Sequence, residues 1–369
     1  MRVLVTGASG FIGSNLVCRL QELGGVEVVS IDRFVFQKSL ESALSDAAMV
    51  FHLAGENRPK CESEFRVGNV ESTERLISAA RRQSRPVPIV YASSSQAAAD
   101  NPYGRSKRQA EDALAAYADE TASAVSVYRF PGVFGKWARP DYNSVVATFC
   151  RNVAEGRSSI VVDPARQLDL AYIDDVVNEM ITHLYGQSKG FRFCSVNPVY
   201  RISVAELLAQ LEAFRNCRSE LVIERVGAGL ARALYSTYLS YLPTTDFSYA
   251  LPAHTDVRGR FVEMLKTKDS GQFSYFTAGV GVTRGGHYHH SKNEKFLVVQ
   301  GSARFRFRHL VSGDSIEMTV SDSAPTVVDT IPGWSHNITN IGDKELIVML
   351  WANEIFDPHR PDTIAGRVE

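Results

Sequence analysis

Three glycines at intervals of three residues, Gly7, Gly10 and Gly13, follow an apolar run at the start of the chain. The run Arg2–Thr6 predicts a buried strand, and the residues from Gly13 onward have the periodicity of an amphipathic helix. In such a turn Gly7 permits the tight bend, Gly10 lets backbone approach a pyrophosphate, and Gly13 lets the helix pack on the strand. The N–H groups at the start of the helix favour bound phosphates. The sequence therefore predicts a dinucleotide-binding α/β unit.

Two residues at the end of the second apolar run bear on which dinucleotide binds. Asp32 lies 19 residues beyond Gly13 and would accept hydrogen bonds from a ribose 2′-hydroxyl, which favours NAD. Arg33 can instead face a 2′-phosphate, which favours NADP. Both cofactors stay open at this point.

Apolar runs alternate with helical patterns over the first 190 residues. This alternation indicates a doubly wound parallel sheet that is buried on both faces. The apolar runs are 2–6, 26–31, 49–53, 88–92 and 125–130, and the helical patterns are 13–23, 72–82, 107–117 and, further on, 203–214.

The pattern changes after about Pro243. Short alternating runs with almost no helix predict an all-β sandwich or barrel. These runs are 273–277, 295–299, 303–309, 315–320, 324–328 and 345–351. We place the boundary between two domains, 1–243 and 244–369, and interpret the Tyr-, Ser- and Thr-rich segment 234–249 as a packed connector.

Composition excludes several classes of function. The 369 residues are 44% hydrophobic and 22% charged with a net charge of -1, which gives no electrostatic reason to bind nucleic acid or an anionic membrane. No apolar run approaches the roughly 20 residues of a membrane span, and the opening strand pattern predicts no secretory signal. The five scattered cysteines indicate reduced thiols, so we expect a cytoplasmic protein.

The segment Asn101–Lys107 contains a tyrosine and a lysine four residues apart at the start of a helical pattern. This spacing puts Tyr103 and Lys107 on one helix face. An ammonium beside a phenol lowers the pKa of the phenol, which suits proton exchange with a carbinol while hydride moves at a nicotinamide. The pair therefore predicts reductase chemistry.

A second set of residues predicts a metal site in the β region. His287 and His289 alternate along one run, so both side chains point to the same side of a strand. Glu294 on the next strand and His336 on a distant one complete a cage of three imidazoles and a carboxylate, which suits zinc, iron, nickel or manganese. A competing set replaces the first two histidines by His290, with Glu294 and His336.

The spacings around these residues resemble the two motifs of the cupin family. Gly281 precedes His287 and Gly301 follows Glu294, while Pro332–His336 with Asn340 is similar to the second motif. The resemblance implies an all-β cupin barrel with the metal inside it.

The glycine spacing resembles the extended short-chain dehydrogenase/reductases, which implies a Rossmann-like fold for the first domain. The segment Thr6–Gly13 matches their opening motif, so Phe11 and Ile12 join the glycines at the cofactor. The tract His52–Gly55 and Asn69 match the segments beside the adenosine ribose, which adds Leu53, Ala54 and Gly55.

The same resemblance assigns a substrate-orienting hydroxyl to Ser94, with Ser95 as second choice. Only nine residues separate Ser94 from Tyr103, whereas the family has about 25, so the substrate mouth must differ. Lys136, Arg139 and Asn143 lie where the family has substrate loops, although a surface role fits each equally well.

Over nearly its full length the chain resembles the CapF-type enzymes of capsular polysaccharide and O-antigen synthesis. The resemblance rests on Asn101–Lys107, the tract 235–249 and above all Gly286–Phe296. It implies that the cupin, with zinc as its metal, epimerises a UDP-2-acetamido-2,6-dideoxy-4-hexulose at carbon 3. The first domain then reduces the 4-ketone with NADPH to a UDP-N-acetyl-L-talosamine-type sugar, a precursor of UDP-N-acetyl-L-fucosamine.

The resemblance also implies a homodimer. For the epimerase base it leaves His287, His290 and Lys295 as candidates. Two other interpretations stay open from the residues alone. In the first, the cupin is a metal-dependent oxygenase that binds iron. In the second, it is a non-catalytic sugar-binding or dimerisation module on a simple reductase.

Overall fold

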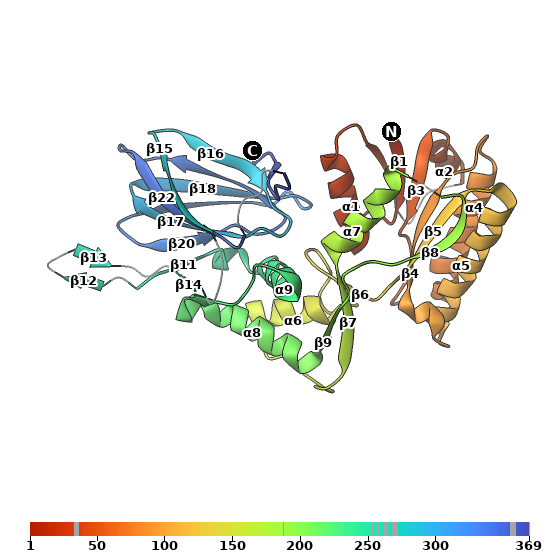
Figure 1. The fold of residues 1–369 in the computed structure, drawn as a ribbon, viewed down its shortest axis with the longest axis horizontal. Coiled ribbons are helices and arrows are strands. Elements are labelled where there is room, and N and C mark those ends of the chain that lie inside the picture. Colours follow the sequence, from red (N-terminus) through yellow and green to blue (C-terminus); the bar gives the residue numbers. More distant parts are fainter. Residues whose placement is uncertain are drawn as a thin grey trace. The chain divides into compact units, whose positions relative to one another are not determined.

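The computed structural model describes residues 1–32, 37–186, 188–252, 254–256, 259–261, 265–267, 272–354 and 359–368. They divide into two compact units (Figure 1). The α/β unit comprises Met1–Ser144 and Gln167–Ile202, and the β-rich unit comprises Val145–Arg166 and Ser203–Glu369. This division into compact units differs from the predicted boundary between the domains 1–243 and 244–369, and that boundary stays a prediction.

The α/β unit is built on a six-stranded sheet in the order β2-β1-β3-β4-β5-β8. Neighbouring strands are parallel throughout. The strands are β1 (Arg2–Thr6), β2 (Glu27–Ile31), β3 (Ala47–His52), β4 (Ile89–Ser94), β5 (Ala124–Phe130) and β8 (Gly190–Cys194). The chain leaves β1 toward one edge and returns to the other side at β3, so the ends of these two strands form the switch point where such sheets bind ligands.

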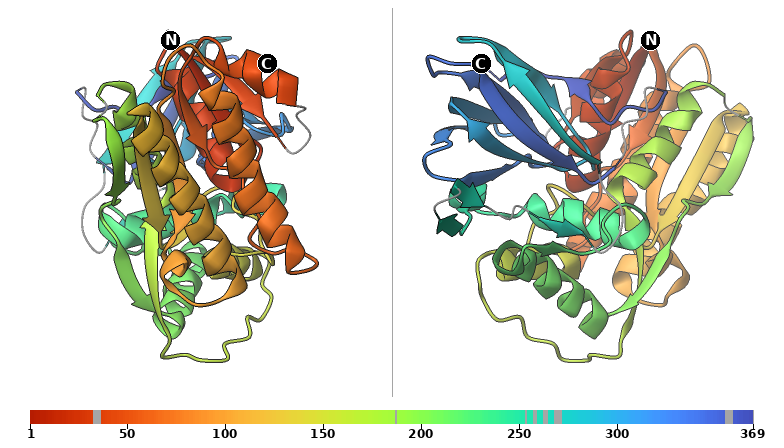
Figure 2. Two further views of the ribbon diagram at one scale, coloured as in Figure 1. Left: turned by 90° about the vertical axis from the view of Figure 1, so that its right-hand side faces the viewer. Right: turned by 60° about the vertical axis from the view of Figure 1, so that its left-hand side comes forward.

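Helices cover both faces of this sheet (Figure 2). α1 packs beside α7, while α4 packs between α2 and α5. The helices are α1 (Phe11–Glu22), α2 (Gln37–Leu44), α3 (Ser63–Phe65), α4 (Ser72–Arg81), α5 (Pro102–Thr121) and α7 (Ile173–Ile181), with short turns η1 (Arg66–Glu71), η2 (Ser95–Ala98) and η3 (Thr182–Leu184). The predicted doubly wound parallel sheet is confirmed.

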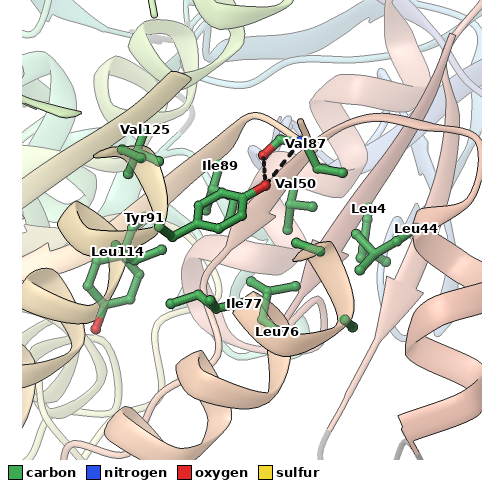
Figure 3. Packing of buried hydrophobic residues seen from close by; sticks show 14 of the residues in the cluster. Leu4, Leu44, Val50, Leu76, Ile77, Val87, Ile89, Tyr91, Leu114 and Val125 are labelled. Atoms are coloured by element: carbon green, nitrogen blue, oxygen red, sulfur yellow. Dashed lines mark hydrogen bonds between the residues drawn. The ribbon is translucent and has the colours of Figure 1, made fainter. Parts of the chain in front are cut away.

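Apolar side chains from strands and helices meet under α4 and α5 (Figure 3). Leu4, Val50 and Ile89 on the sheet and Leu114 on α5 are each at most 1% exposed. Tyr117 is polar only at its hydroxyl, which accepts from the Val87 N–H at 3.1 Å and donates to the Val87 carbonyl at 3.0 Å. These strands are apolar on both faces because both faces are covered.

Two five-stranded antiparallel sheets make up most of the β-rich unit. One has the order β11-β20-β17-β22-β15 and the other β19-β18-β21-β16-β23. Their strands are β11 (Ser248–Ala250), β20 (Thr326–Asp329), β17 (Glu294–Gln300), β22 (Leu346–Ala352), β15 (Gln272–Ala278), β19 (Ser315–Ser321), β18 (Ser302–His309), β21 (Trp334–Asn340), β16 (Thr283–Tyr288) and β23 (Ile364–Ala365).

Aromatic rings from the two sheets pack against each other. The ring centres of Phe296 on β17 and Phe305 on β18 are 5.6 Å apart. Within the described ranges, no strand of one five-stranded sheet is hydrogen-bonded to a strand of the other. The all-β prediction is therefore confirmed, and the closed cupin barrel stays a prediction.

Three helices also belong to the β-rich unit: α6 (Val145–Ala154), α8 (Val204–Glu220) and α9 (Gly229–Leu239). α8 begins at a Ser cap, because the Ser203 hydroxyl accepts from the Glu206 N–H while the Glu206 carboxylate accepts from the Ser203 N–H. The segment interpreted as a connector is in part the helix α9, which packs against α6 and α8.

The remaining short elements are β6 (Gly132–Phe134), β7 (Gln167–Tyr172) and β9 (Tyr200–Ser203), which form one small sheet, together with β10 (Val222–Ile223), β12 (His254–Asp256), β13 (Gly259–Phe261), β14 (Lys266–Thr267) and η4 (Thr244–Asp246). Across the described stretches, none of the helices combines the length and apolarity that crossing a bilayer requires.

Candidate functional site

The predicted glycine turn joins β1 to α1 at the switch point. Gly7 has a φ of +68°, which side chains other than glycine adopt with strain. A Cβ on Gly13 would lie 2.1 Å from the Gly7 carbonyl oxygen, so only glycine allows α1 to start this close to the strand. Gly10 is the N-cap of α1 and Phe11 and Ile12 form its first turn, whose N–H groups point out of the helix start. The turn thus has the shape that a pyrophosphate requires.

Residues at the ends of β2 and β3 border this turn. The Ser9 N–H donates to the Asp32 carboxylate at 3.2 Å, which places Asp32 beside the glycine turn. Leu53 donates its N–H to the Thr6 carbonyl at 3.1 Å, and Ala54 packs directly against Gly7. Arg33 lies outside the described residues.

His52 links three elements beneath the turn. Its ring nitrogens lie 2.7 Å from the Thr6 hydroxyl and 2.9 Å from the Thr73 hydroxyl. Burial, reinforced by the charge of Lys107, lowers the pKa of His52 to about 3. The imidazole is therefore neutral. Its hydrogen bonds connect β3 to β1 and α4, and it does not act as an acid–base group.

Asn69 serves the same part of the site from the π-helical turn η1. Its side-chain oxygen accepts from the Glu56 N–H and its amide donates to the Glu56 carbonyl, each at 2.9 Å. The amide also donates to the Ser106 hydroxyl at 2.9 Å, and that hydroxyl donates to the Tyr103 carbonyl at 2.7 Å. Asn69 therefore fixes both the segment after Gly55 and the first turn of α5.

Tyr103 lies in the first turn of α5, where the Asn101 side chain caps the helix. A hydrogen bond with Ser94 favours its ionised form, but burial outweighs this and the pKa of Tyr103 is raised. The lowered pKa expected from Lys107 is therefore wrong for this structure, because the ammonium bonds to other groups. The role of Ser94 as the substrate-orienting hydroxyl stays a prediction.

The short connection between Ser94 and Tyr103 is the turn η2. A Cβ on Gly104 would lie 2.2 Å from the Gln96 carbonyl oxygen and 2.6 Å from that of Ala99. Glycine at this position therefore lets α5 start directly against η2. This contact replaces the longer loop of the family and was not predicted from the sequence.

Lys107 is only 5% exposed and lies one helical turn beyond Tyr103. Its ammonium donates to the Ala92 carbonyl at 2.9 Å and to the Tyr91 hydroxyl at 3.2 Å. Burial lowers the pKa of Lys107 to about 8, and the charge of Glu111 partly opposes this. A lysine held by neutral acceptors is thus charged at neutral pH but close to titrating.

Glu111 extends the same face of α5 by another turn, and sequence reasoning missed it. Arg129 on β5 donates to both of its oxygens, with the shortest contact at 2.6 Å. Ser93, the neighbour of Ser94, donates to Glu111 at 2.5 Å. The sequence signal that could have identified Glu111 is its spacing of four residues after Lys107, which puts both side chains on one face of a helix.

The β-rich unit brings together the four metal ligands that we preferred from the sequence. One ligand atom each from His287, His289, Glu294 and His336 can be chosen so that all lie within 4.8 Å of one another. His287 and His336 are cross-strand partners on β16 and β21. The competing set is not the one assembled, because among the described residues His290 is not part of this group.

The polar atoms of this cluster suit a cation. Both ring nitrogens of His336 are buried and have no hydrogen-bond partner in the described part of the chain. Burial lowers the pKa of His287, to about 4, so this imidazole is neutral and able to bind a metal. Burial opposes ionisation of Glu294, but the neighbouring histidines and Lys292 hold its pKa well below the usual range. Neutral imidazoles around a carboxylate are a suitable ligand set for zinc.

Lys295 points away from this cluster, because it follows Glu294 on the strand. Lys295 is 1% exposed, and its ammonium lies 2.6 Å from the Asp329 carboxylate, which Arg218 on α8 also contacts at 2.7 Å. Although burial opposes the charge, Asp329 and nearby tyrosines raise the pKa of Lys295 well above its ordinary value. The candidacy of Lys295 as the epimerase base stays a prediction, which this ion pair does not support.

The chain matches known families in both halves. Residues 3–192 match the NAD dependent epimerase/dehydratase family, and residues 254–364 match the polysaccharide biosynthesis C-terminal domain. A UDP-2-acetamido-2,6-beta-L-arabino-hexul-4-ose reductase of Pseudomonas aeruginosa strain PA103 is 51% identical over 368 residues, covering 100% of this chain and 99% of that protein. The crystal structure of the capsular polysaccharide assembling protein CapF from Staphylococcus aureus superposes with a TM-score of 0.68 at 40% identity and full coverage of both chains.

The chain belongs to the CapF-like branch of the NAD dependent epimerase/dehydratase family. A more distant relative, UDP-glucuronate 4-epimerase 1 of Arabidopsis thaliana, is 27% identical over 322 residues and covers 68% of this chain and 74% of that protein. The Pseudomonas aeruginosa reductase and CapF thus match this chain over its full length, whereas the Arabidopsis epimerase matches only part of it.

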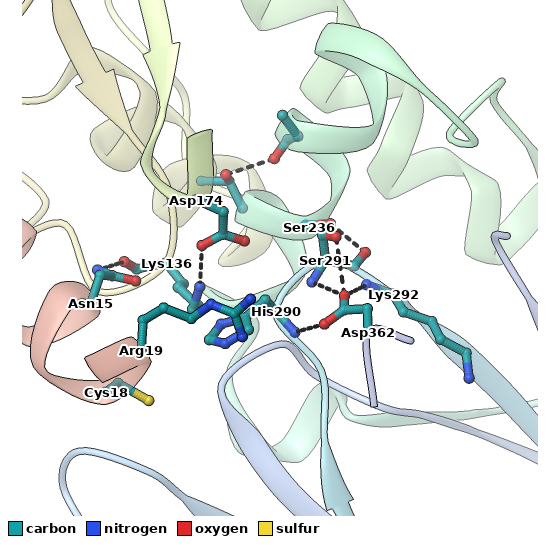
Figure 4. Close-up of polar contacts among 12 residues, drawn as sticks. Asn15, Cys18, Arg19, Lys136, Asp174, Ser236, His290, Ser291, Lys292 and Asp362 are labelled. Carbon is teal, nitrogen blue, oxygen red and sulfur yellow. Dashed lines mark hydrogen bonds and ion pairs between the residues drawn. The ribbon is translucent and has the colours of Figure 1, made fainter. Parts of the chain in front are cut away.

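Not every residue near the family's substrate loops is exposed in this CapF-like chain. Lys136 is 2% exposed, and its ammonium lies 2.6 Å from the Asp174 carboxylate (Figure 4). Its carbonyl accepts from the Asn15 amide at 3.3 Å. Lys136 therefore ties the segment after β6 to α1 and α7, which contradicts the surface role considered for it.

Proposed function

We propose that this chain is a bifunctional nucleotide-sugar enzyme. The β-rich unit epimerises a UDP-2-acetamido-2,6-dideoxy-4-hexulose at carbon 3, and the α/β unit reduces the 4-keto group with NADPH. The product is a UDP-N-acetyl-L-talosamine-type sugar, a precursor of UDP-N-acetyl-L-fucosamine. The observation that carries the proposal is the 51% identity, over the whole chain, to a reductase whose name specifies a UDP-linked 2-acetamido-2,6-hexul-4-ose.

The α/β unit supports the reduction with three side chains. Ser94 lies close enough to Tyr103 to lower its pKa, and in this proposal both hydroxyls contact one carbonyl oxygen of the sugar. When bound, the nicotinamide supplies a hydride to carbon 4. Tyr103 gives its phenolic proton to the oxygen, which balances the reduction of the ketone to an alcohol. The Lys107 ammonium stabilises the negative charge left on the phenol.

The glycine turn supports a dinucleotide, and the resemblance favours NADPH. Asp32 lies beside the turn, where it would contact the ribose that carries the 2′ group. Measurement of kcat/KM with NADPH and with NADH tests the choice of cofactor directly.

The β-rich unit supports a divalent cation, which we propose to be zinc. His287, His289, Glu294 and His336 hold it in this proposal. A cation here supplies positive charge for an enolate or holds the pocket in shape. Epimerisation needs a base that removes the proton at carbon 3 and a return of a proton to the opposite face, with no net oxidation. Of the two histidines considered for that base, His290 is the one outside this ligand set.

We also propose that the enzyme is a cytoplasmic homodimer. An exposed apolar pair on the outer sheet, Tyr275 and Met349, supports a contact surface on the β-rich unit. The two are cross-strand partners on β15 and β22, with 72% and 38% of their surface exposed. Light scattering of the purified chain tests the dimer.

The deciding experiment separates the two reactions in the full-length protein. The chain is incubated in deuterated water with the 4-keto sugar and without NADPH, and incorporation at carbon 3 is followed by NMR. NADPH is then added, and its consumption and the product stereochemistry are measured. We expect exchange before NADPH is added and reduction afterwards.

Two variants assign the reactions to the units. Tyr103→Phe should retain exchange and lose reduction, whereas His336→Ala should lose exchange. Full NADPH turnover by Tyr103→Phe would refute the reductase site. Reduction without any exchange would favour a β-rich unit that only binds, and oxygen uptake with bound iron would favour an oxygenase.

A further inference from the structure

The segment that follows His289 is held by a residue from the C-terminal tail, residues 359–368 (Figure 4). One oxygen of Asp362 accepts the His290 N–H at 2.9 Å. The other accepts the N–H groups of Ser291 and Lys292, each at 2.7 Å, and the Ser291 hydroxyl at 3.1 Å. A single carboxylate thus fixes three successive peptide groups, and hydrogen bonds to a charged acceptor are stronger than neutral ones.

The backbone of Asp362 also contacts a member of the His/Glu cluster. Its carbonyl oxygen lies within hydrogen-bond distance of Nδ1 of His289. A carbonyl can only accept, so Nδ1 carries the proton and the lone pair is left on Nε2. Nε2 is the atom that faces Glu294, at 3.1 Å from its Oε2. The tail therefore selects the tautomer that can bind a cation in the cluster.

The same carboxylate positions Glu294 indirectly. Lys292, whose N–H is bound by Asp362, directs its ammonium to Oε1 of Glu294 at 2.7 Å. That contact occupies one carboxylate oxygen and leaves Oε2 toward the histidines. Asp362 thus acts on the cluster through both His289 and the Lys292–Glu294 pair.

The tail itself is firmly attached to the sheet that carries His287. β23 pairs with β16, with His287 opposite Ala365 and Tyr288 opposite Ile364. The Gly366 N–H donates to the Gly286 carbonyl at 2.9 Å. A Cβ on Gly366 would lie 2.8 Å from both the Ser335 hydroxyl oxygen and the Tyr288 ring, so the tail packs closely at this point.

We propose that Asp362 is a positioning residue for metal binding, and that the tail 359–368 sets how tightly and for how long the His/Glu cluster holds its cation. This inference rests on the proposed metal site. It assigns to Asp362 no contact with the metal or with substrate. Its effect is to hold His289 and the Lys292–Glu294 pair in the ligating arrangement.

The test measures metal binding by the full-length chain in the absence of substrate. Zinc affinity is determined by competition with a chromophoric chelator, and cobalt is used as a spectroscopic probe of the ligand geometry. For Asp362→Ala we expect zinc affinity to fall about 10–100-fold, as for other groups that orient metal ligands. The cobalt absorption bands should shift, and release of metal to the chelator should accelerate. Asp362→Asn keeps one acceptor oxygen but places a donating amide NH2 group against the backbone N–H groups, so its zinc affinity should fall between those of the wild type and Asp362→Ala.

Asp322→Asn is the matched control. Its carboxylate also accepts a backbone N–H, from Gly301 at 2.9 Å, in a turn of the same unit. This variant should bind zinc as the wild type does.

The outcomes separate the inference from the proposed function. If the wild-type chain binds no zinc or cobalt, the metal site itself is refuted. If the wild type binds and both Asp362 variants bind equally well with the same cobalt spectrum, the positioning role is refuted. Unfolding of the metal-free proteins is measured alongside. A loss of metal affinity that only mirrors a lower folded fraction would also overturn the proposal.

Discussion

The two units each bury a lysine, and the two lysines have opposite properties. Lys107 in the α/β unit is 5% exposed and Lys295 in the β-rich unit is 1% exposed. The pKa of Lys107 falls to about 8 through burial, whereas that of Lys295 rises well above its ordinary value despite burial, because Asp329 lies 2.6 Å away. Burial alone does not decide the state of the ammonium. The charge of the partner does.

This difference distinguishes a lysine that can act in catalysis from one that stabilises the fold. Lys107 bonds to a carbonyl and a phenol, which leaves its charge available to a neighbouring phenolate. Lys295 forms an ion pair with Asp329, and Arg218 on α8 forms a second ion pair with the same carboxylate. Substitution of each lysine by methionine, which has a similar length and no charge, tests the contrast.

The largest expected effect is on the activity of Lys107→Met. Loss of the Lys107 ammonium, one helical turn beyond Tyr103, should lower kcat for NADPH-dependent reduction by about 10²–10⁴-fold, the range of a positioned proton-transfer group. Deuterium exchange at carbon 3 should be unaffected. Steady-state assays of both reactions check this, and a loss of both together would contradict the separation of the sites.

Lys295→Met should show the reverse behaviour. Breaking a buried ion pair costs about 3–5 kcal/mol of unfolding free energy, and the remaining Arg218–Asp329 pair places this change at the lower end. Urea denaturation measures the loss, with metal content and kcat of the folded fraction as controls. A folded Lys295→Met protein without carbon-3 exchange would support this residue as the base.

The pH dependence of stability should also differ between the lysines. The pKa of Lys107 is lowered on folding, so between about pH 8 and 10.5 the unfolded chain binds a proton that the folded chain has released. This group therefore makes the protein more stable as pH rises through that window, by up to about 3 kcal/mol. The raised pKa of Lys295 has the opposite sign, since its contribution is complete below 10.5 and is lost only above that value. Denaturation of wild type and Lys107→Met across this range should show the upward slope only in the wild type.

The smallest expected effect is a shift of the pH–rate profile. If charged Lys107 is required, kcat for reduction should fall as pH rises through about 8. Glu111 raises the pKa of Lys107, so Glu111→Gln should move this basic limb to lower pH. Arg105→Gln on the same helix is the control, because its ion pairs with Asp100 and Glu62 are exposed. An unchanged limb in Glu111→Gln would mean that Lys107 does not set it.

Much of the fold was predictable because the strands of both units follow a simple hydrophobic pattern. The run 315–320 corresponds to β19 at Ser315–Ser321, and 125–130 corresponds to β5 at Ala124–Phe130. The helix α9 was missed because its second half, Tyr235–Tyr238, is made of Tyr, Ser and Thr, although Leu230–Leu234 before it consists of strong helix formers. Its buried residues, such as Tyr235 and Tyr238, are fixed by packing on Phe214 of α8.

The sites were predictable to the extent that their spacing is local. Tyr103 and Lys107 share a helix face, and His287 and His289 share a strand, so a short motif specifies each pair. The state of Tyr103 was not predictable, since it depends on how deeply the phenol is buried and on where Lys107 finds its acceptors. Asp362 left no signal either, because it reaches Ser291 from 71 residues away and binds backbone groups common to every sequence.

The division of the chain into units has a consequence for its synthesis on the ribosome. The α/β unit closes once residue 202 has emerged, but 145–166 must wait for partners that are made later. The strands and helices of the β-rich unit then follow, and β23 with Asp362 comes after all of them. A nascent chain that has not yet reached β23 therefore lacks the carboxylate that holds the segment after His289. The His/Glu cluster thus acquires its full set of contacts later in synthesis than the strands that carry its four ligands.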